Sequence, residues 1–205
     1  MQDNNKNSSK TSFEIRVAKD TFKFNASHFV AFDGFRERLH GHNYTVAVRL
    51  LGCHELGQDG YVLDFGDVKA VTKKVCKDLN EYFLCPMYSD VLTILDENNI
   101  LCLECQDGAK FQFPTGDCRK LPIVHSTAEE MAIYVWGKIV KGLDVKLLRR
   151  RGIHTMEVTC AEAPGQEALF RMTIPENEDE IDDICDVRKY VSTSKSKMAR
   201  PPCCY

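Results

Sequence analysis

The alternation of hydrophobic and polar residues predicts two β-strands in the first part of the chain. Between residues 12 and 31 the alternation indicates one long or bent strand. Side chains two apart in a strand share a face, so one face of this strand should carry Phe22, Phe24, Ala26 and His28. A second alternating run, rich in β-branched residues, spans roughly residues 43 to 54. We expect the two strands to pair antiparallel.

Farther along, the hydrophobic period lengthens to three or four residues, which indicates amphipathic helices. The first helix is predicted to begin at Phe65 and to end before Pro86. Residues 91 to 113 contain short apolar runs around turn residues and predict a small β-meander inserted between the helices. A second helix should begin in the segment Ser126-Thr127-Ala128-Glu129, which has the pattern of a capping box, and continue to Leu143.

Two more strands are predicted, at residues 154 to 160 and at about 168 to 174. This order of elements predicts an α+β fold in which a four-stranded antiparallel sheet carries two helices on one face. The folded domain should span residues 12 to 175. Residues 1–11 are polar, and residues 176–205 are acidic and then basic and Ser-rich, so we expect a disordered N-terminus and a flexible charged tail.

Composition excludes several classes of function. A net charge of -3 gives no general electrostatic reason to bind nucleic acid. The sequence has no secretory signal and no apolar run of membrane-spanning length, so no membrane association is expected. Its 10 cysteines are scattered rather than arranged as a disulfide scaffold, which is typical of reduced thiols in a cytoplasmic protein.

Histidines give the first indication of chemistry. His40 and His42 stand two apart and lead into the second predicted strand, so in the same extended backbone their imidazoles should share a face. Antiparallel pairing would bring His28 close to them. Three histidine ligands without a fourth protein ligand leave one coordination position open, as in catalytic zinc sites. We therefore predict that these three residues bind Zn²⁺.

Five motifs together resemble the 6-pyruvoyltetrahydropterin synthase family, and they occur in the family order across about residues 12 to 174. The motifs are Ala26-Ser27-His28, His40-Gly41-His42-Asn43-Tyr44, Asp64-Phe65-Gly66-Asp67-Val68-Lys69, Ser126-Thr127-Ala128-Glu129, and Glu162 after a strand. The resemblance implies the tunnelling fold, in which four-stranded sheets from three subunits close into a barrel. Two such trimers would stack into a homohexamer with active sites between subunits.

The resemblance also implies roles for individual residues. The three histidines correspond to the family's zinc ligands. Glu162 corresponds to the glutamate that anchors the pterin, and a carboxylate suits the two N–H donors of the aminopyrimidine edge. Thr127 and Glu129 correspond to residues that line the pterin pocket. The implied substrate is 7,8-dihydroneopterin triphosphate.

The chain departs from the best-known members at one catalytic position. Those members carry a catalytic cysteine shortly before the His-Gly-His motif, whereas residues 29 to 39 contain none. Glu37 stands three residues before His40, as in the variant pattern Glu-x-x-His-Gly-His-Asn known from malaria parasites and some bacteria. We therefore predict that Glu37 is the catalytic base. The family's Leu-Asp-His at the end of the first helix is also replaced, by Leu79-Asn80-Glu81.

Several interpretations remain open. The glutamate variant is associated with 6-hydroxymethyl-7,8-dihydropterin, a folate precursor, and the cysteine enzymes with 6-pyruvoyl-5,6,7,8-tetrahydropterin, on the tetrahydrobiopterin route; one enzyme could form both. The chain could instead be a 6-carboxytetrahydropterin synthase of the deazaguanine pathway, or an inactive pterin-binding homologue. A solvated loop charge would also explain Glu37, helix capping would explain Glu129, and an exposed turn would explain Glu162.

Overall fold

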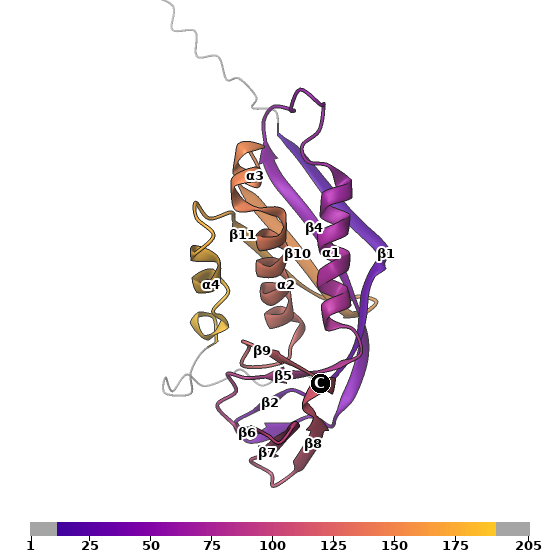
Figure 1. Ribbon diagram of the computed structural model, residues 1–205, viewed down its shortest axis with the longest axis vertical. Coiled ribbons are helices and arrows are strands. Elements are labelled where there is room, and N and C mark those ends of the chain that lie inside the picture. Colours follow the sequence, from indigo (N-terminus) through magenta and orange to yellow (C-terminus); the bar gives the residue numbers. More distant parts are fainter. Residues whose placement is uncertain (1–11, 192–205) are drawn as a thin grey trace, which may run out of the picture.

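The structure, a computed structural model, describes residues 12–191 and has one large mixed sheet (Figure 1). Its six strands lie in the order β11-β10-β4-β1-β5-β9. The first four pair antiparallel, as predicted: β11 (Gln166–Thr173), β10 (Thr155–Ala163), β4 (His40–Cys53) and β1 (Phe13–His28). Two short parallel strands, β5 (Tyr82–Pro86) and β9 (Cys118–Leu121), extend the sheet beyond β1. The predicted number of four strands is therefore wrong.

The extra strand β5 arises because helix α1 (Phe65–Leu79) ends earlier than predicted. Glu81 has a φ of +65°, which helical backbone does not permit, and its amide donates to the Asn25 carbonyl over 2.6 Å. The next apolar residues then pair with β1. A short apolar run suits a buried strand as well as a helix, so periodicity alone did not separate the two.

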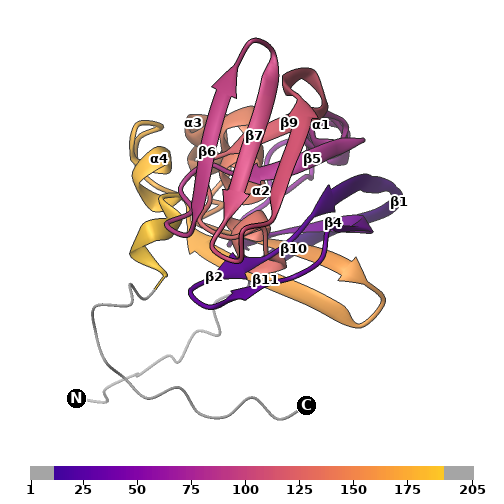
Figure 2. The same cartoon turned by 90° about the horizontal axis from the view of Figure 1, so that it is seen from below.

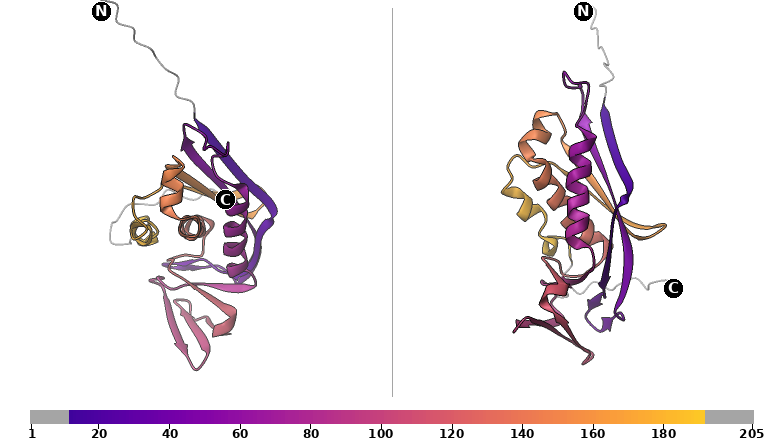
Figure 3. Two further views of the ribbon diagram at one scale, coloured as in Figure 1. Left: turned by 45° about the horizontal axis from the view of Figure 1, so that its top comes forward. Right: turned by 45° about the vertical axis from the view of Figure 1, so that its right-hand side comes forward.

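The predicted second helix is confirmed as α2 (Ala128–Leu143), and it covers the same face of the sheet as α1 (Figure 3). Its N-cap is Thr127, whose hydroxyl oxygen accepts from the Glu130 amide. Glu130 therefore occupies the third helical position, and the predicted capping box with Glu129 is wrong by one residue. A short helix that the pattern did not predict, α3 (Val145–Arg150), follows.

The core lies between the two long helices and the antiparallel strands. The predicted inner face of β1 is confirmed, because Phe22, Phe24, Ala26 and His28 are at most 2% exposed. Trp136 on α2 is completely buried, and its indole N–H donates to the Met156 carbonyl on β10 over 2.9 Å. This contact fixes α2 against β10.

The β-meander predicted at 91–113 is confirmed as a separate three-stranded sheet of β6 (Leu92–Glu97), β7 (Ile100–Cys105) and β8 (Lys110–Pro114). It projects from the end of the domain at which β5, β9 and a small hairpin lie (Figure 2). That hairpin consists of β2 (Ala31–Phe32) and β3 (Phe35–Arg36). A 3₁₀ turn at Thr115–Asp117 joins the meander to β9.

The expected flexible tail is wrong for residues 176–191. This segment forms helix α4 (Glu180–Ile184) and a 3₁₀ turn at Val187–Lys189, and Ile181 and Val187 are each 1% exposed. Its many acidic residues suggested disorder, but these two apolar side chains dock it on the core. Residues 1–11 and 192–205, also expected to be flexible, lie outside the described part. Within residues 12–191, no helix combines the length and the apolar character needed to cross a membrane.

Candidate active site

Three histidine rings meet where β1 ends and β4 begins. His28 is the last residue of β1 and pairs directly with His40, while His42 pairs with Ala26. The ring centroids of His28 lie 4.5 Å from His40 and 5.1 Å from His42, and those of His40 and His42 are 4.9 Å apart. One nitrogen from each ring lies within 4.8 Å of the others. The antiparallel register therefore produces the cluster that the spacing predicted.

Hydrogen bonds to main-chain carbonyls orient two of these rings. Nδ1 of His28 lies 2.7 Å from the Ser126 carbonyl oxygen, and Nδ1 of His40 lies 2.8 Å from that of Arg38. Because a carbonyl only accepts, Nδ1 must carry the proton in each ring. The lone pair is then on Nε2, the arrangement found in histidines that bind metals.

The buried Nε2 atom of His28 has no hydrogen-bond partner within the described residues. Burial lowers the pKa of His28 to about 4, so its imidazole is neutral near pH 7. A buried, unpaired nitrogen lone pair is costly unless something binds it. Its orientation and the two adjacent imidazoles fit a divalent metal ion such as Zn²⁺.

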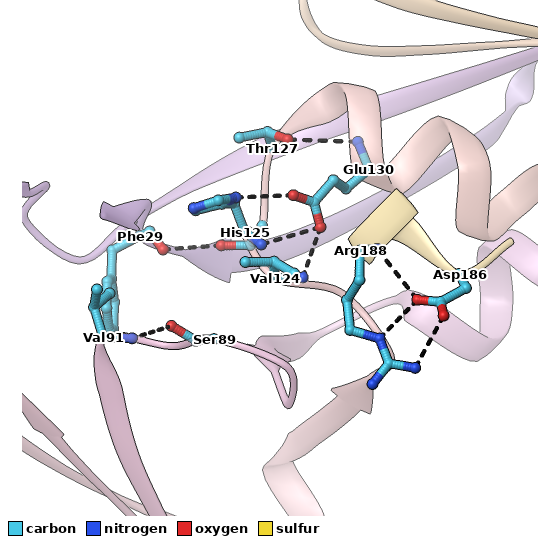
Figure 4. A network of polar contacts seen from close by, with 10 residues as sticks. Phe29, Ser89, Val91, Val124, His125, Thr127, Glu130, Asp186 and Arg188 are labelled. Carbon is cyan, nitrogen blue, oxygen red and sulfur yellow. Dashed lines mark hydrogen bonds and ion pairs between the residues drawn. The ribbon is translucent and has the colours of Figure 1, made fainter. Parts of the chain in front are cut away.

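A buried carboxylate, Glu130, fixes the segment that holds His28 (Figure 4). It accepts hydrogen bonds from the amides of Val124 and His125, over 2.7 and 3.0 Å, and lies 2.9 Å from Nδ1 of His125. The next residue, Ser126, contacts the His28 ring through its carbonyl and donates from its hydroxyl to the Phe29 carbonyl over 2.9 Å. Sequence reasoning missed Glu130, although the N-cap at Thr127 places it at the capping-box position.

Glu37 lies on the loop that follows β3, and its main chain and side chain both bond to Val30. Its amide donates to the Val30 carbonyl over 2.9 Å, and its carboxylate accepts from the Val30 amide over 3.0 Å. Burial lowers the pKa of His28, and the negative charge of Glu37 opposes this effect weakly. The half-buried carboxylate therefore lies within electrostatic reach of the histidine cluster.

Glu162, on β10, lies beside the same cluster. One of its carboxylate oxygens is 4.0 Å from Nε2 of His28, and its side chain is 22% exposed. The same oxygen accepts a hydrogen bond from the hydroxyl of Tyr44 over 3.3 Å. Burial, together with the charge of Glu162, raises the pKa of Tyr44, so its phenol stays a neutral donor. Tyr44 was part of a sequence motif, but its role in holding Glu162 was not predicted.

The comparison with protein families supplies the identification. The family model for 6-pyruvoyl tetrahydropterin synthase matches residues 16–173. This chain belongs to the 6-pyruvoyl tetrahydropterin synthase family. The synthase of Plasmodium vivax is 43% identical to it and has a TM-score of 0.77, with 80% of this chain and 99% of that chain covered. The Plasmodium falciparum synthase is 42% identical, with a TM-score of 0.78 and the same coverage.

Other relatives refine the position of this synthase within the family. A further structure of the Plasmodium vivax synthase, 42% identical with a TM-score of 0.77 and covering 80% of this chain and 99% of that chain, is a mutant in which a catalytic glutamate is replaced by alanine. The 6-carboxy-5,6,7,8-tetrahydropterin synthase of Haemophilus influenzae is 30% identical over 61% of this chain and 82% of its own length. This chain has the Glu-x-x-His-Gly-His-Asn pattern at Glu37 to Asn43. Together with the family match and the Plasmodium structures, that pattern assigns the chain to the glutamate variant of this family of lyases.

The two remaining residues that resemblance assigned to the pterin pocket lie at the start of α2. The hydroxyl of Thr127 caps the helix, and Glu129 is exposed on its first turn. At the position of the family's Asp-His pair, the Asn80 side chain accepts a hydrogen bond from the Asn25 amide over 2.9 Å. In this synthase that asparagine therefore joins the end of α1 to β1.

Proposed function

We propose that this chain is a zinc-dependent lyase that acts on 7,8-dihydroneopterin triphosphate, with Glu37 as the catalytic base. The observation that carries the proposal is the unpaired Nε2 atom of His28, which faces two further imidazoles and lies 4.0 Å from Glu162. The Plasmodium vivax relative with a catalytic glutamate supports the choice of a carboxylate base. The product would be 6-hydroxymethyl-7,8-dihydropterin, 6-pyruvoyl-5,6,7,8-tetrahydropterin or both.

Each side chain of the proposed site would have one task. His28, His40 and His42 would hold Zn²⁺, which as a Lewis acid makes the hydroxyls of the substrate side chain more acidic. Glu162 would accept the paired N–H donors of the pterin ring, and the Tyr44 hydroxyl would keep its carboxylate in place. Glu37 would take a proton from the substrate.

The identity of the base bears on the product. A carboxylate is harder and less basic than a thiolate, which favours removal of a proton from oxygen over removal from carbon. Loss of the proton from one side-chain hydroxyl converts its carbon into an aldehyde as the adjacent carbon–carbon bond breaks, and the triphosphate-bearing fragment leaves as this aldehyde. The electron pair of the broken bond moves into the conjugated dihydropterin, and a proton is then returned to the carbon that stays attached to the ring. This retro-aldol sequence gives the hydroxymethyl product without any oxidant or reductant.

A second candidate is 6-carboxytetrahydropterin synthase activity. It is favoured by the Haemophilus influenzae relative and by a Methanocaldococcus jannaschii protein provisionally given the same name, which is 30% identical over 73% of this chain and 89% of its own length. The absence of cysteine from residues 29 to 39 weighs against it, since the enzymes of that pathway normally use the cysteine. Incubating the purified protein with 7,8-dihydroneopterin triphosphate and identifying the pterin products by mass spectrometry separates these activities.

Replacing the proposed base tests the mechanism. Glu37→Gln should lower kcat by about 10²-fold to 10⁴-fold, because a positioned general base contributes about that much. Its affinity for the pterin and its metal content should stay close to wild type, since Glu37 is neither a proposed metal ligand nor the proposed anchor of the pterin. Glu97→Gln, at an exposed carboxylate of β6, is the control and should keep full activity. Normal turnover by Glu37→Gln would remove this residue from the mechanism.

Replacing a histidine tests the metal site. His42→Ala should lose most of the bound metal, because two imidazoles hold zinc much more weakly than three. The measurement is metal identity and stoichiometry by inductively coupled plasma mass spectrometry. His54→Ala, at an exposed histidine outside the cluster, should retain the ion. Full metal content in His42→Ala would contradict the ligand assignment, and an ion other than zinc would contradict the choice of metal.

We further propose that the protein works as a homohexamer of two stacked trimers, in the cytoplasm. The free thiols of the described cysteines are compatible with a reducing compartment. The edge strand β11 offers backbone groups with which another subunit's sheet could pair.

A further inference from the structure

The β-meander of residues 91–114 has a small hydrophobic core that includes the start of the segment carrying Glu37. Phe29 and Ala31 are buried in that core together with residues of β7. The ring of Phe29 stacks on Phe111 of β8, with 5.0 Å between centroids. The segment 29–37, which we call the Glu37 loop, therefore rests on the meander at its first residues.

Arg36 connects the far end of the Glu37 loop to the meander. Its Nε atom donates to Oδ2 of Asp107 over 2.9 Å, and its Nη2 atom forms an ion pair with the same oxygen over 2.8 Å. Its Nη1 atom donates to the carbonyl of Glu37 over 2.8 Å, and its guanidinium lies 5.5 Å from the ring centre of Phe111. One planar side chain thus joins the turn of the meander to the main chain of the proposed base.

A second polar contact holds the tip of the hairpin. The Gln106 side chain accepts from the Gly34 amide over 3.2 Å and donates to Asp33 over 3.4 Å. A cavity of about 230 Å³ separates this hairpin from the meander. Gln106 and Asp107 supply polar contacts between the hairpin and the meander beside this cavity.

The contacts with the meander are connected to the Glu37 carboxylate through Val30. Val30, which follows Phe29, bonds to both the main chain and the side chain of Glu37, so the loop is closed upon itself. Its two ends are then fixed by Phe111 and Asp107, both on the meander. Carboxylate orientation is therefore coupled to a part of the fold that contributes no residue to the histidine cluster.

We propose that the meander positions Glu37, with Asp107 as the main positioning residue, acting through Arg36. The proposal rests on the proposed role of Glu37 as base. Catalytic groups must be held to a fraction of an ångström, and a displacement of 1 Å costs about 10²-fold in rate. Asp107 is 48% exposed and touches no residue of the histidine cluster, so its effect on the reaction would pass through the loop alone.

The test uses Asp107→Asn. Asparagine keeps the side-chain oxygen that accepts from the Ala109 amide, so the turn is preserved, while the charge that holds Arg36 is removed. Its matched control is Glu104→Gln, which removes a carboxylate paired with Lys110 in the same meander, away from the Glu37 loop. Both proteins are compared with wild type in their full-length, metal-loaded form.

Hydrogen exchange gives a readout that does not depend on activity. In Asp107→Asn, exchange of the amides of Val30, Gly34 and Glu37 should become about tenfold faster, because these bonds open locally more often. Glu104→Gln should leave them unchanged. Unchanged exchange in Asp107→Asn would overturn the proposal, whatever the catalytic role of Glu37.

Kinetics then show whether the effect passes through Glu37. Asp107→Asn should lower kcat about tenfold, with KM within about twofold and metal content unchanged. In a Glu37→Ala background, single-turnover product formation should be the same with and without Asp107→Asn. An equal loss in both backgrounds would overturn the coupling. Wild-type turnover by Glu37→Ala alone would instead refute the proposed base, while the exchange experiment would still decide whether Asp107 positions the loop.

Discussion

At the scale of single residues, Glu130 should matter for stability. Its side chain is 7% exposed; one carboxylate oxygen accepts from two main-chain amides, and the other lies 2.9 Å from Nδ1 of His125. The neutral amide of glutamine accepts more weakly than a carboxylate and puts an NH2 group in place of one of these oxygens. Glu130→Gln should lower the free energy of unfolding by about 2 to 3 kcal/mol. Chemical denaturation measures this, with the exposed neighbour Glu129→Gln as control, expected to change stability by less than about 0.5 kcal/mol. Equal effects at both positions would show that the Glu130 bonds contribute little.

The sequence was enough to predict some residues of the proposed site but not others. Two histidines two apart on a strand and a third on its antiparallel partner are enough to predict a cluster, because strand geometry fixes which side chains share a face. The carboxylate of Glu130 could not be predicted in the same way. Its partners are main-chain amides of a loop whose path depends on tertiary packing, and the helix was expected to start one residue too early.

At the scale of elements, helix α4 should contribute to stability despite its acidic sequence. Ile181 is 1% exposed, and a Cβ atom added to Gly137 on α2 would lie 2.5 Å from Sγ of Cys185, so the two helices pack closely. Ile181→Ala should lower the free energy of unfolding by about 2 to 4 kcal/mol. The measurement is denaturant unfolding of the full chain. Asp182→Ala, which removes only an exposed pair with Lys141, should cost less than about 1 kcal/mol.

The local sequence pattern predicted an element correctly where the turn residues favour one type of turn. The meander was found because Asn98 and Asn99, with φ of +53° and +62°, form the type of turn that joins β-hairpin strands. By contrast, β5 was assigned to a helix because Phe83 continues the three-to-four-residue spacing of the apolar residues on α1. Its conformation is decided by pairing with β1, a contact that a local pattern does not contain. The docking of α4 was also missed because it depends on tertiary contacts. The acidic composition of this segment indicated disorder, whereas two apolar residues, Ile181 and Val187, pack into the core.

At the scale of the whole molecule, the antiparallel sheet has one face covered by helices (Figure 1) and another that carries ion pairs. These pairs join Arg171 on β11 to Glu157 on β10, and Arg49 on β4 to Glu14 on β1. A charged face is a poor surface for sheet-on-sheet packing, so association is expected through strand edges instead. A barrel closed in that way would have a polar interior, which agrees with the proposed hexamer.

The proposed assembly makes a measurable prediction. Six chains of 23.3 kDa would weigh about 140 kDa, and size-exclusion chromatography with light scattering should show this mass. If active sites form between subunits, dilution or mild urea that yields smaller species should abolish turnover before the chain unfolds, as followed by Trp136 fluorescence. That residue is completely buried inside one subunit and so reports on the fold of the single chain. A fully active species of one chain's mass would contradict the assembly, and since the three histidines come from one chain, it would also show that each subunit forms a complete site.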